Sequence, residues 1–258
     1  MTKIIPRFGR FHYNNHINDS FLGGKPMEQA LKITSVLSDP TRFHIYEYIA
    51  KVHREVSVQE IAEKFHIHPN VARLHLTKLE DVRMVVSDTQ KTGKGGRPSR
   101  LYRLSDEVIG LYFPFRDYQL LARIAIQTMA KLGSIGSEAL RETGKQFGRE
   151  LIASRLPHNG TASTLTMADK IAIIEEAAET AGFLPQLHYD EEKEVLYLDI
   201  FNCPFKEIAA QAPDTVCSMH HAFLEGMVET LFARAEVTET ENMMKGGHRC
   251  AYRIVICP

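Results

Sequence analysis

The four cysteines of this 258-residue chain are Cys203, Cys217, Cys250 and Cys257, and none occurs earlier. Three of them fall where we expect one element to end or another to begin: Cys203 just past a strand, Cys217 near the start of a helix and Cys250 at the start of the last strand. Such boundaries can turn several side chains and free N–H groups toward one cavity, which suits a cluster of thiolates. The spacing therefore predicts metal or redox chemistry at these three thiols.

The fourth donor of such a site is left open by the sequence. Cys250 and Cys257 are seven residues apart, which is about 23 Å along a continuous strand, and they would point to opposite faces of it. They cannot both bind one metal centre unless the strand bends. The possible fourth ligands are therefore the nearby histidines or the last cysteine: His220, His221, His248 or Cys257.

A second group of polar side chains has the spacing of a DNA-reading helix. Pro69 is well placed to start a helix, and Asn70, Arg73 and Thr77 then share one face within about two turns. Asparagine can pair with adenine and arginine with guanine by two hydrogen bonds each, although either can instead hold a phosphate. His68 lies in the turn before this helix, where a structural or phosphate-binding role is favoured over base readout.

The elements that must position this helix precede it in the chain. Ser57 and Glu60 have the spacing of a capping box, which begins a short helix that ends near Phe65. Within the following helix we expect four apolar residues to face the core: Val71, Leu74, Leu79 and Val82. The two helices and the tight turn between them predict a helix-turn-helix.

Two alternating stretches, 84–89 and 99–104, predict strands joined by a basic, glycine-rich loop. Its glycines allow a close approach to a nucleic-acid backbone, and its cations favour phosphates or the minor groove. We expect contacts there from Lys91, Lys94, Arg97 and Arg100, and a further phosphate contact from Arg42 near the start of an earlier helix. A helix-turn-helix followed by such a hairpin is a winged helix, which binds double-stranded DNA.

The charge distribution divides the chain into a basic and an acidic part. Residues 40–104 hold 12 Lys and Arg against 7 Asp and Glu, whereas residues 105–258 hold 14 against 22. Only the first part is therefore expected to meet a polyanion. We predict a flexible N-terminal arm at 1–26, a winged-helix domain at 27–105, and a sensor and dimerisation domain at 106–258.

The acidic part predicts helices packed on a small antiparallel sheet, so that the fold class of the chain is α+β. Three long amphipathic stretches precede two strand-like segments near 186–201, and a further helix and a final strand follow. The first helix carries an apolar stripe with two possible roles, the core of the domain or the seam of a dimer: Tyr118, Leu121, Ile124, Ala125, Thr128, Met129 and Leu132. Gly144 and Gly148 in the next helix permit close helix contact.

Several stretches resemble the ArsR-type winged-helix repressors, and more narrowly their SufR-like branch. They are SVLSDPTRFHIYEYI, VQEIAEKFHIHPNVARLHLTKLE and GRPSRLYRL. The resemblance implies a homodimeric regulator, a repressor, that binds a DNA operator. The Cys-x-Cys motif by which ArsR proteins sense soft metals is absent from this sequence, which disfavours that mechanism.

The C-terminal part resembles the same branch through NCPF, VC and GG-x-x-C-x-Y. This resemblance implies an iron–sulfur cluster bound by Cys203, Cys217 and Cys250. The branch often has another cysteine between the second and the last, and here the residues from 218 to 249 have none. The same part also resembles the vinyl-reductase-like ligand-binding modules.

Other interpretations remain open for the cysteines and for the whole protein. Zinc, a thiol redox switch, or simple packing of small apolar side chains would each use the same residues, and the C-terminal part could instead bind a small organic ligand. The chain has no nucleotide-binding loop, HExxH motif or Gly-x-Ser-x-Gly elbow, so we do not expect an enzyme. It has no apolar run of membrane-spanning length and no apolar leader, so we expect a cytoplasmic protein without a membrane partner.

Overall fold

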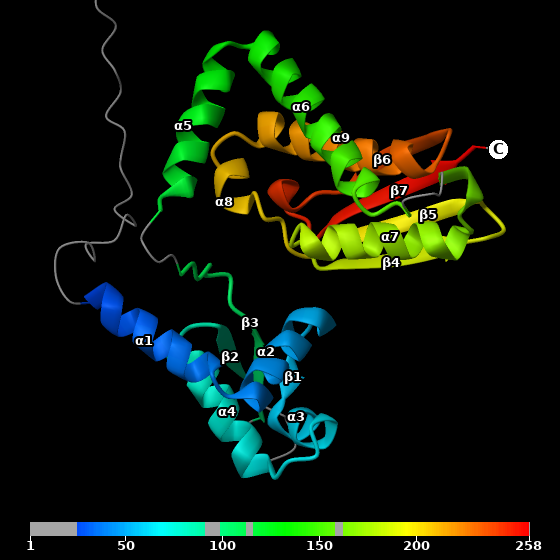
Figure 1. The fold of residues 1–258 in the computed structure, drawn as a ribbon. Helices are drawn as coiled ribbons and strands as arrows, with labels where there is room; N and C mark the ends of the chain where they lie inside the picture. The colour runs from blue at the N-terminus through cyan, green and yellow to red at the C-terminus, as the bar shows by residue number, and fades with distance from the viewer. Residues whose placement is uncertain (1–24, 91–98, 112–115, 158–161, 258) are drawn as a thin grey trace, which may run out of the picture. The chain divides into compact units, whose positions relative to one another are not determined.

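A computed structural model describes residues 25–90, 99–111, 116–157 and 162–257 (Figure 1). The chain forms two compact units, residues 1–111 and 112–258, and each is described by itself. The predicted flexible arm lies almost wholly outside the described residues, although Lys25 and Pro26 already belong to the first helix. Helices combine with antiparallel strands, so that the α+β class is confirmed.

Within its described residues, the first unit places four helices around a small three-stranded sheet. Strand β1, which the sequence did not predict, pairs with β3 through Val56 and Tyr102, so the sheet order is β1-β3-β2. The elements are α1 (Lys25–Leu37), α2 (Pro40–Val52), β1 (Val56–Ser57), α3 (Val58–Lys64), α4 (Pro69–Asp81), β2 (Val85–Gln90) and β3 (Ser99–Leu104).

Short polar residues begin helices α2 and α3. The Asp39 carboxylate accepts from the backbone N–H of Arg42 at 3.0 Å, and Ser57 Oγ accepts from that of Glu60 at 3.1 Å. The predicted capping box is only half formed, because the Glu60 carboxylate instead accepts from Tyr48 Oη at 2.8 Å and from Arg54. These bonds satisfy N–H groups that a helix start leaves free.

The second unit packs helices on one face of a four-stranded antiparallel sheet of order β4-β5-β7-β6. Strand β6 and the short α8 were not predicted. The elements are α5 (Tyr118–Lys131), α6 (Ser134–Ala153), the 3₁₀ turn η2 (Ala162–Thr164), α7 (Met167–Thr180), β4 (Pro185–Asp190), β5 (Val195–Ile200), α8 (Lys206–Ala209), α9 (Pro213–Leu231), β6 (Ala235–Glu241), η3 (Met243–Lys245) and β7 (Cys250–Ile256).

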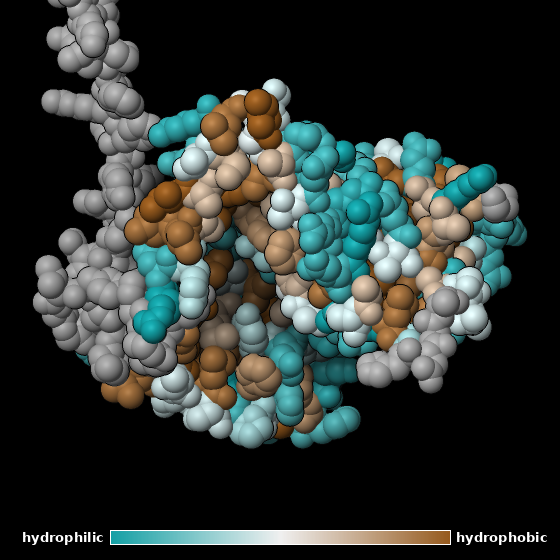
Figure 2. Space-filling view, turned by 45° about the horizontal axis from the view of Figure 1, so that its top comes forward, coloured by the Kyte–Doolittle hydropathy of each residue, from teal (hydrophilic) through white to brown (hydrophobic). Residues whose placement is uncertain are grey.

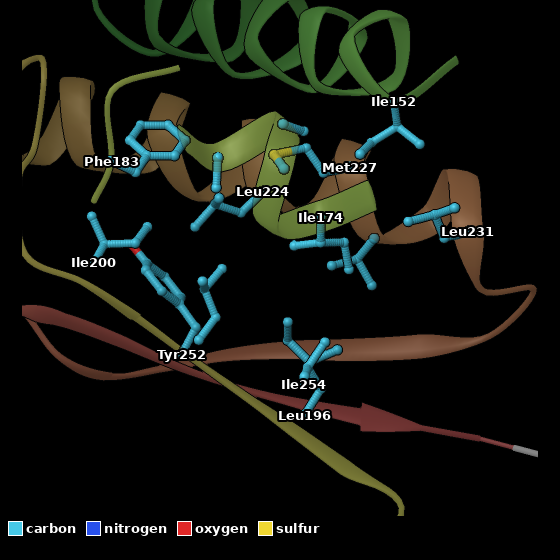
Figure 3. Close-up of a cluster of buried hydrophobic side chains, with 14 of the residues drawn as sticks. Ile152, Ile174, Phe183, Leu196, Ile200, Leu224, Met227, Leu231, Tyr252 and Ile254 are labelled. Carbon is cyan, nitrogen blue, oxygen red and sulfur yellow. The ribbon is translucent and has the colours of Figure 1, made fainter. Parts of the chain in front are cut away.

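The core of this unit lies between the sheet and helices α6, α7 and α9 (Figure 3). The central strands β5 and β7 are paired so that Leu196 lies opposite Ile254, Leu198 opposite Tyr252, and Ile200 opposite Cys250. All six residues are buried. Cys250 therefore continues the row of buried side chains at one end of the sheet.

Helices α6 and α9 are in contact at the level of their backbones. A Cβ atom added to Gly148 would collide with the Phe223 carbonyl, and one added to Gly226 would collide with the Lys145 carbonyl. At Gly144 it would lie 2.7 Å from the Met219 carbonyl oxygen. The predicted close contact at Gly144 and Gly148 is thus confirmed, and α9 is the helix that makes it.

Helix α5 packs on α6 but has no buried residue. Of its apolar stripe, Leu121 is 63%, Ile124 55% and Leu132 57% exposed, so the stripe does not form the core of this unit. Figure 2 shows hydrophobic side chains gathered on the surface of the α5–α6 hairpin. No helix in the described part of the chain is long and apolar enough to cross a membrane.

Candidate nucleic-acid interface and thiol cluster

Helix α4 follows α3 through a four-residue turn. His68 ends this turn, and its Nδ1 accepts from the backbone N–H of Asn70 at 3.2 Å. Its ring therefore caps the helix, in agreement with the structural role that the sequence favoured. Pro69 occupies the first helical turn, where no N–H is required.

The outer face of α4 brings together the side chains predicted to read DNA. Asn70 and Arg73 are exposed and Thr77 is half-buried, whereas the opposite face is buried through Ala72, His75, Leu76 and Leu79. The prediction that Val71 and Leu74 face the core is wrong, since they are 40% and 55% exposed. The predicted polar residues thus lie together on a surface that also carries large apolar side chains.

Two of the predicted phosphate-binding arginines have partners inside the unit. Arg42 Nη1 donates to the Val36 carbonyl at 2.8 Å, and only 14% of its side chain is exposed. Arg100 donates to both carboxylate oxygens of Glu80 and to Ser87 Oγ. Both arginines therefore stabilise contacts between elements of the unit. Lys91, Lys94 and Arg97 lie outside the described residues.

His75 is a polar residue on the buried face of α4. His75 Nδ1 lies 4.0 Å from Asp39 Oδ2, and only 10% of the His75 side chain is exposed. Burial lowers the pKa of His75, while the Asp39 carboxylate acts to raise it. This pair links the start of α2 to the middle of α4.

The structure places the thiols of Cys203, Cys217 and Cys250 within electrostatic range of one another. Cys203 follows the end of β5, Cys217 lies near the start of α9, and Cys250 begins β7. Burial raises the pKa of the Cys203 thiol to about 11, and the other two thiols add to the rise. Tyr252 lies within electrostatic range of all three, and burial, followed by the charges of these thiols and of Glu239, raises its pKa far above the usual range.

Polar groups of the segment after β6 contact two of these thiols. The Met243 backbone N–H donates to Cys250 Sγ at 3.5 Å. Burial raises the pKa of Cys217, and a hydrogen bond with the buried Asn242 side chain opposes that rise. All three thiols thus lie where burial favours the protonated form in the absence of a bound cation.

The four candidates for a further ligand differ sharply in their surroundings. His220 is 3% exposed, its Nε2 has no hydrogen-bond partner in the part of the chain that the structure describes, and burial lowers its pKa to about 4. Its ring contacts Phe183, Phe205 and Tyr252. His221 Nε2 instead lies 3.2 Å from the Val237 carbonyl oxygen.

The two remaining candidates lie on the outside. The backbone N–H of His248 donates to Glu241 at 2.9 Å, and His248 is exposed. Cys257 is exposed and follows the far end of β7, with the whole continuous strand between it and Cys250. Of the four, His220 is the residue with a buried ring nitrogen that has no hydrogen-bond partner among the described residues, and it lies one helical turn after Cys217 on α9.

The donor types suit a metal or an iron–sulfur cluster, but they are not arranged around a single point. Within the described residues, no group of three His, Cys, Asp or Glu side chains has the geometry to hold a metal ion. The three thiols lie within electrostatic range of Tyr252, and the His220 ring contacts the Tyr252 ring. Binding would require these side chains to turn toward one another.

The comparison with known families agrees with the arrangement of α3 and α4. Residues 37–88 match the family model described as a helix-turn-helix domain. The first unit is a helix-turn-helix domain. This match supports a DNA-binding regulator, and the described residues combine helices with antiparallel sheets.

The helix-turn-helix unit is followed by a second recognised domain. Residues 167–255, which include Cys203, Cys217 and Cys250, match the family model described as methanogen output domain 1. A crystal structure of trafficking protein particle complex subunit 3 from Naegleria fowleri, covalently bound to palmitic acid, is similar over 54% of this chain and 97% of that chain, with 13% identity and a TM-score of 0.38. A search of curated proteins found no match.

Proposed function

We propose that this protein is a transcriptional repressor that binds a pseudo-palindromic DNA operator as a homodimer and responds to the state of its C-terminal thiols. The observation that carries the DNA-binding part is the outer face of α4, where Asn70, Arg73 and Thr77 lie together beyond a capped turn. In a helix-turn-helix this face enters the major groove, and each copy reads one half-site.

The base-reading role is tested with the full chain and an operator selected from a random duplex pool. Arg73→Ala should weaken binding to the operator by about 1–3 kcal/mol and relax the preference at one base pair. Lys32→Ala on α1 is the control, since it removes one exposed positive charge from the same unit. Equal losses from the two variants, measured by fluorescence anisotropy, would show that α4 does not read the bases.

In this proposal the wing, the segment between β2 and β3, adds binding that does not depend on the DNA sequence. Lys94 and Arg97 hold phosphates, so the double variant Lys94→Ala, Arg97→Ala should weaken all duplexes alike. The slope of binding against salt concentration should become shallower by about one to two ions. An unchanged slope would remove the wing from the interface.

The homodimer is proposed to form through the exposed face of α5. The sequence left two roles for this stripe, and the structure leaves the stripe outside the core. With Tyr118 and Ile135, its exposed side chains offer on the order of 500 Å² of apolar surface. A standard interface buries about 800 Å² per partner, somewhat more than half of it apolar, so the area suffices for a second copy.

The oligomeric state tests this surface directly. Leu121→Asp with Ile124→Asp should convert a dimer to a monomer in sedimentation equilibrium. Leu31→Asp is the control, because Leu31 is 63% exposed on α1 and lies outside the stripe. A wild-type monomer at all concentrations, or a dimer that survives the double substitution, contradicts the proposal.

The sensing part of the proposal assigns an iron–sulfur cluster to Cys203, Cys217 and Cys250, with His220 as the fourth ligand. Support comes from the donor set: three thiols within electrostatic range of one another, and a buried Nε2 that has no partner among the described residues. Such a cluster binds thiolates and changes charge when it is oxidised, reduced or lost. The thiols would release their protons on binding, since the metal stabilises thiolates.

Anaerobic purification distinguishes the cluster from its alternatives. We expect absorbance at about 400–420 nm together with equal amounts of iron and sulfide, lost in Cys203→Ser and His220→Leu and retained in Cys257→Ser. Colourless protein that stays so after reconstitution would overturn the assignment. Bound zinc, or a reversible disulfide among the three thiols, would then replace the cluster as the sensing chemistry.

A further inference from the structure

The outer face of the recognition helix α4 carries two large apolar side chains that the described residues of the first unit leave exposed. Leu74 is 55% and Val71 40% exposed. The helix has enough small and apolar residues to face the core without them, because Ala72, Leu76 and Leu79 are fully buried. Leu74 and Val71 are thus outside for a reason other than the packing of the unit.

Leu74 lies near the centre of the face that meets DNA. At about 100° per residue it is about 40° around the helix from Asn70 and about 60° from Thr77. It lies four residues after Asn70 and three before Thr77, so it is a surface neighbour of both. The buried residues Ala72 and Leu79 point to the other side of α4. If Asn70 and Thr77 enter the major groove, Leu74 therefore enters it with them.

The major groove offers one apolar group to such a side chain. Among the four bases only thymine presents a methyl group there, at C5, whereas the others present hydrogen-bonding atoms. A leucine at the centre of the groove leaves those polar atoms without a partner, unless it lies over a thymine. One helical turn separates Leu74 from Asn70, which corresponds to about one to two base pairs along the duplex.

We propose that Leu74, flanked by Val71, reads a thymine C5-methyl group in each half-site, within about two base pairs of the base contacted by Asn70. This inference rests on the proposed DNA-binding function and names a specificity-determining residue within it. It assigns to the operator a required A·T pair that is recognised by shape and apolar contact rather than by a hydrogen bond.

Replacing thymine by deoxyuridine tests the contact without altering base pairing. The full chain first selects an operator from a random duplex pool, and each thymine is then exchanged singly. At one position per half-site we expect binding about three- to fivefold weaker, the loss that one buried methyl group produces. Leu74→Ala should bind the thymine and deoxyuridine duplexes equally at that position.

A control variant and two different negative results distinguish the role of Leu74 from the proposed DNA-binding function. Leu31→Ala, on α1 and 63% exposed, should retain the full deoxyuridine effect. Failure to select any preferred sequence would overturn the DNA-reading function itself. A selected operator with no deoxyuridine effect, or with an effect that persists in Leu74→Ala, would overturn only the role of Leu74. The comparison of thymine and deoxyuridine duplexes needs only the wild-type protein, so its result does not depend on the folding of a variant.

Discussion

Arg100 donates to both carboxylate oxygens of Glu80, at 2.9 and 3.0 Å, and so joins strand β3 to the last turns of helix α4. The same guanidinium donates through Nε to Ser87 Oγ on β2, which in turn donates to Glu80. These contacts fix the base of the wing relative to the recognition helix. Arg100 was predicted to hold DNA, and this geometry gives it a positioning role.

Glu80→Gln and Arg100→Met should each lower the free energy of unfolding by about 1 kcal/mol, because an ion pair that solvent partly screens contributes little more than this. The double variant should lose hardly more than either single variant. Urea unfolding of the full chain measures this. Both variants should also weaken DNA binding to the same small extent. A loss of DNA affinity confined to Arg100→Met would restore a direct contact.

Gly148→Ala should destabilise the C-terminal unit by about 1–3 kcal/mol, the usual effect of overpacking. Alanine favours a helix over glycine by about 1 kcal/mol, so a net loss can only come from the collision with the Phe223 carbonyl. Thr143→Ala on the exposed side of α6 is the matched control and should be neutral or slightly stabilising. Thermal unfolding followed by circular dichroism compares them; equal behaviour would contradict the backbone contact.

Acid should weaken the first unit through His75. Burial holds the pKa of His75 below its ordinary value, so the unfolded chain takes up a proton before the folded one does. The stability is therefore fully present above about pH 6.5 and declines as the pH falls below it. His75→Leu should flatten this decline in urea titrations between about pH 7.5 and 5, and parallel profiles for the two proteins would contradict the assignment.

The four thiols should react with iodoacetamide in a fixed order in reduced, chelator-treated protein. Cys257 is exposed and should be alkylated first, whereas Cys203 is buried with its pKa raised to about 11 and should be last. Peptide mass spectrometry over time at about pH 8 gives the four rates. Cys203 reacting as fast as Cys257 would show that the thiol cluster is open to solvent.

Elements with a clear start and a strong period could be predicted from the sequence. Asp39 before Pro40, and Pro69 after the turn, mark helix starts that local hydrogen bonds and proline geometry determine. Gly182 follows α7 with a φ of 82°, which other residues rarely adopt. Strand β6 escaped notice because AEVTETE lacks large apolar residues, and its place at the edge of the sheet depends on pairing with the distant β7.

The buried face of α4 was predicted wrongly because its buried residues are not its largest apolar residues. Positions 72, 75, 76 and 79 have the helical period, but they include an alanine and a histidine, whereas the larger Val71 and Leu74 face outward. Apolar size is a poor guide where a surface serves binding. The sequence also placed the three cysteines at element ends. The position of Cys250 relative to Cys203, however, depends on the pairing of Ile200 with Cys250, and no local pattern determines that register.

The backbone contact between α6 and α9 has a mechanical consequence. Helices that touch through glycines have no side-chain layer in which a small displacement can be absorbed, so the two move as one body or step to a new register. Cys217 belongs to α9, and α6 leads back through the turn at Gly133 to α5. A displacement of Cys217 on α9 is therefore transmitted through α6 to α5.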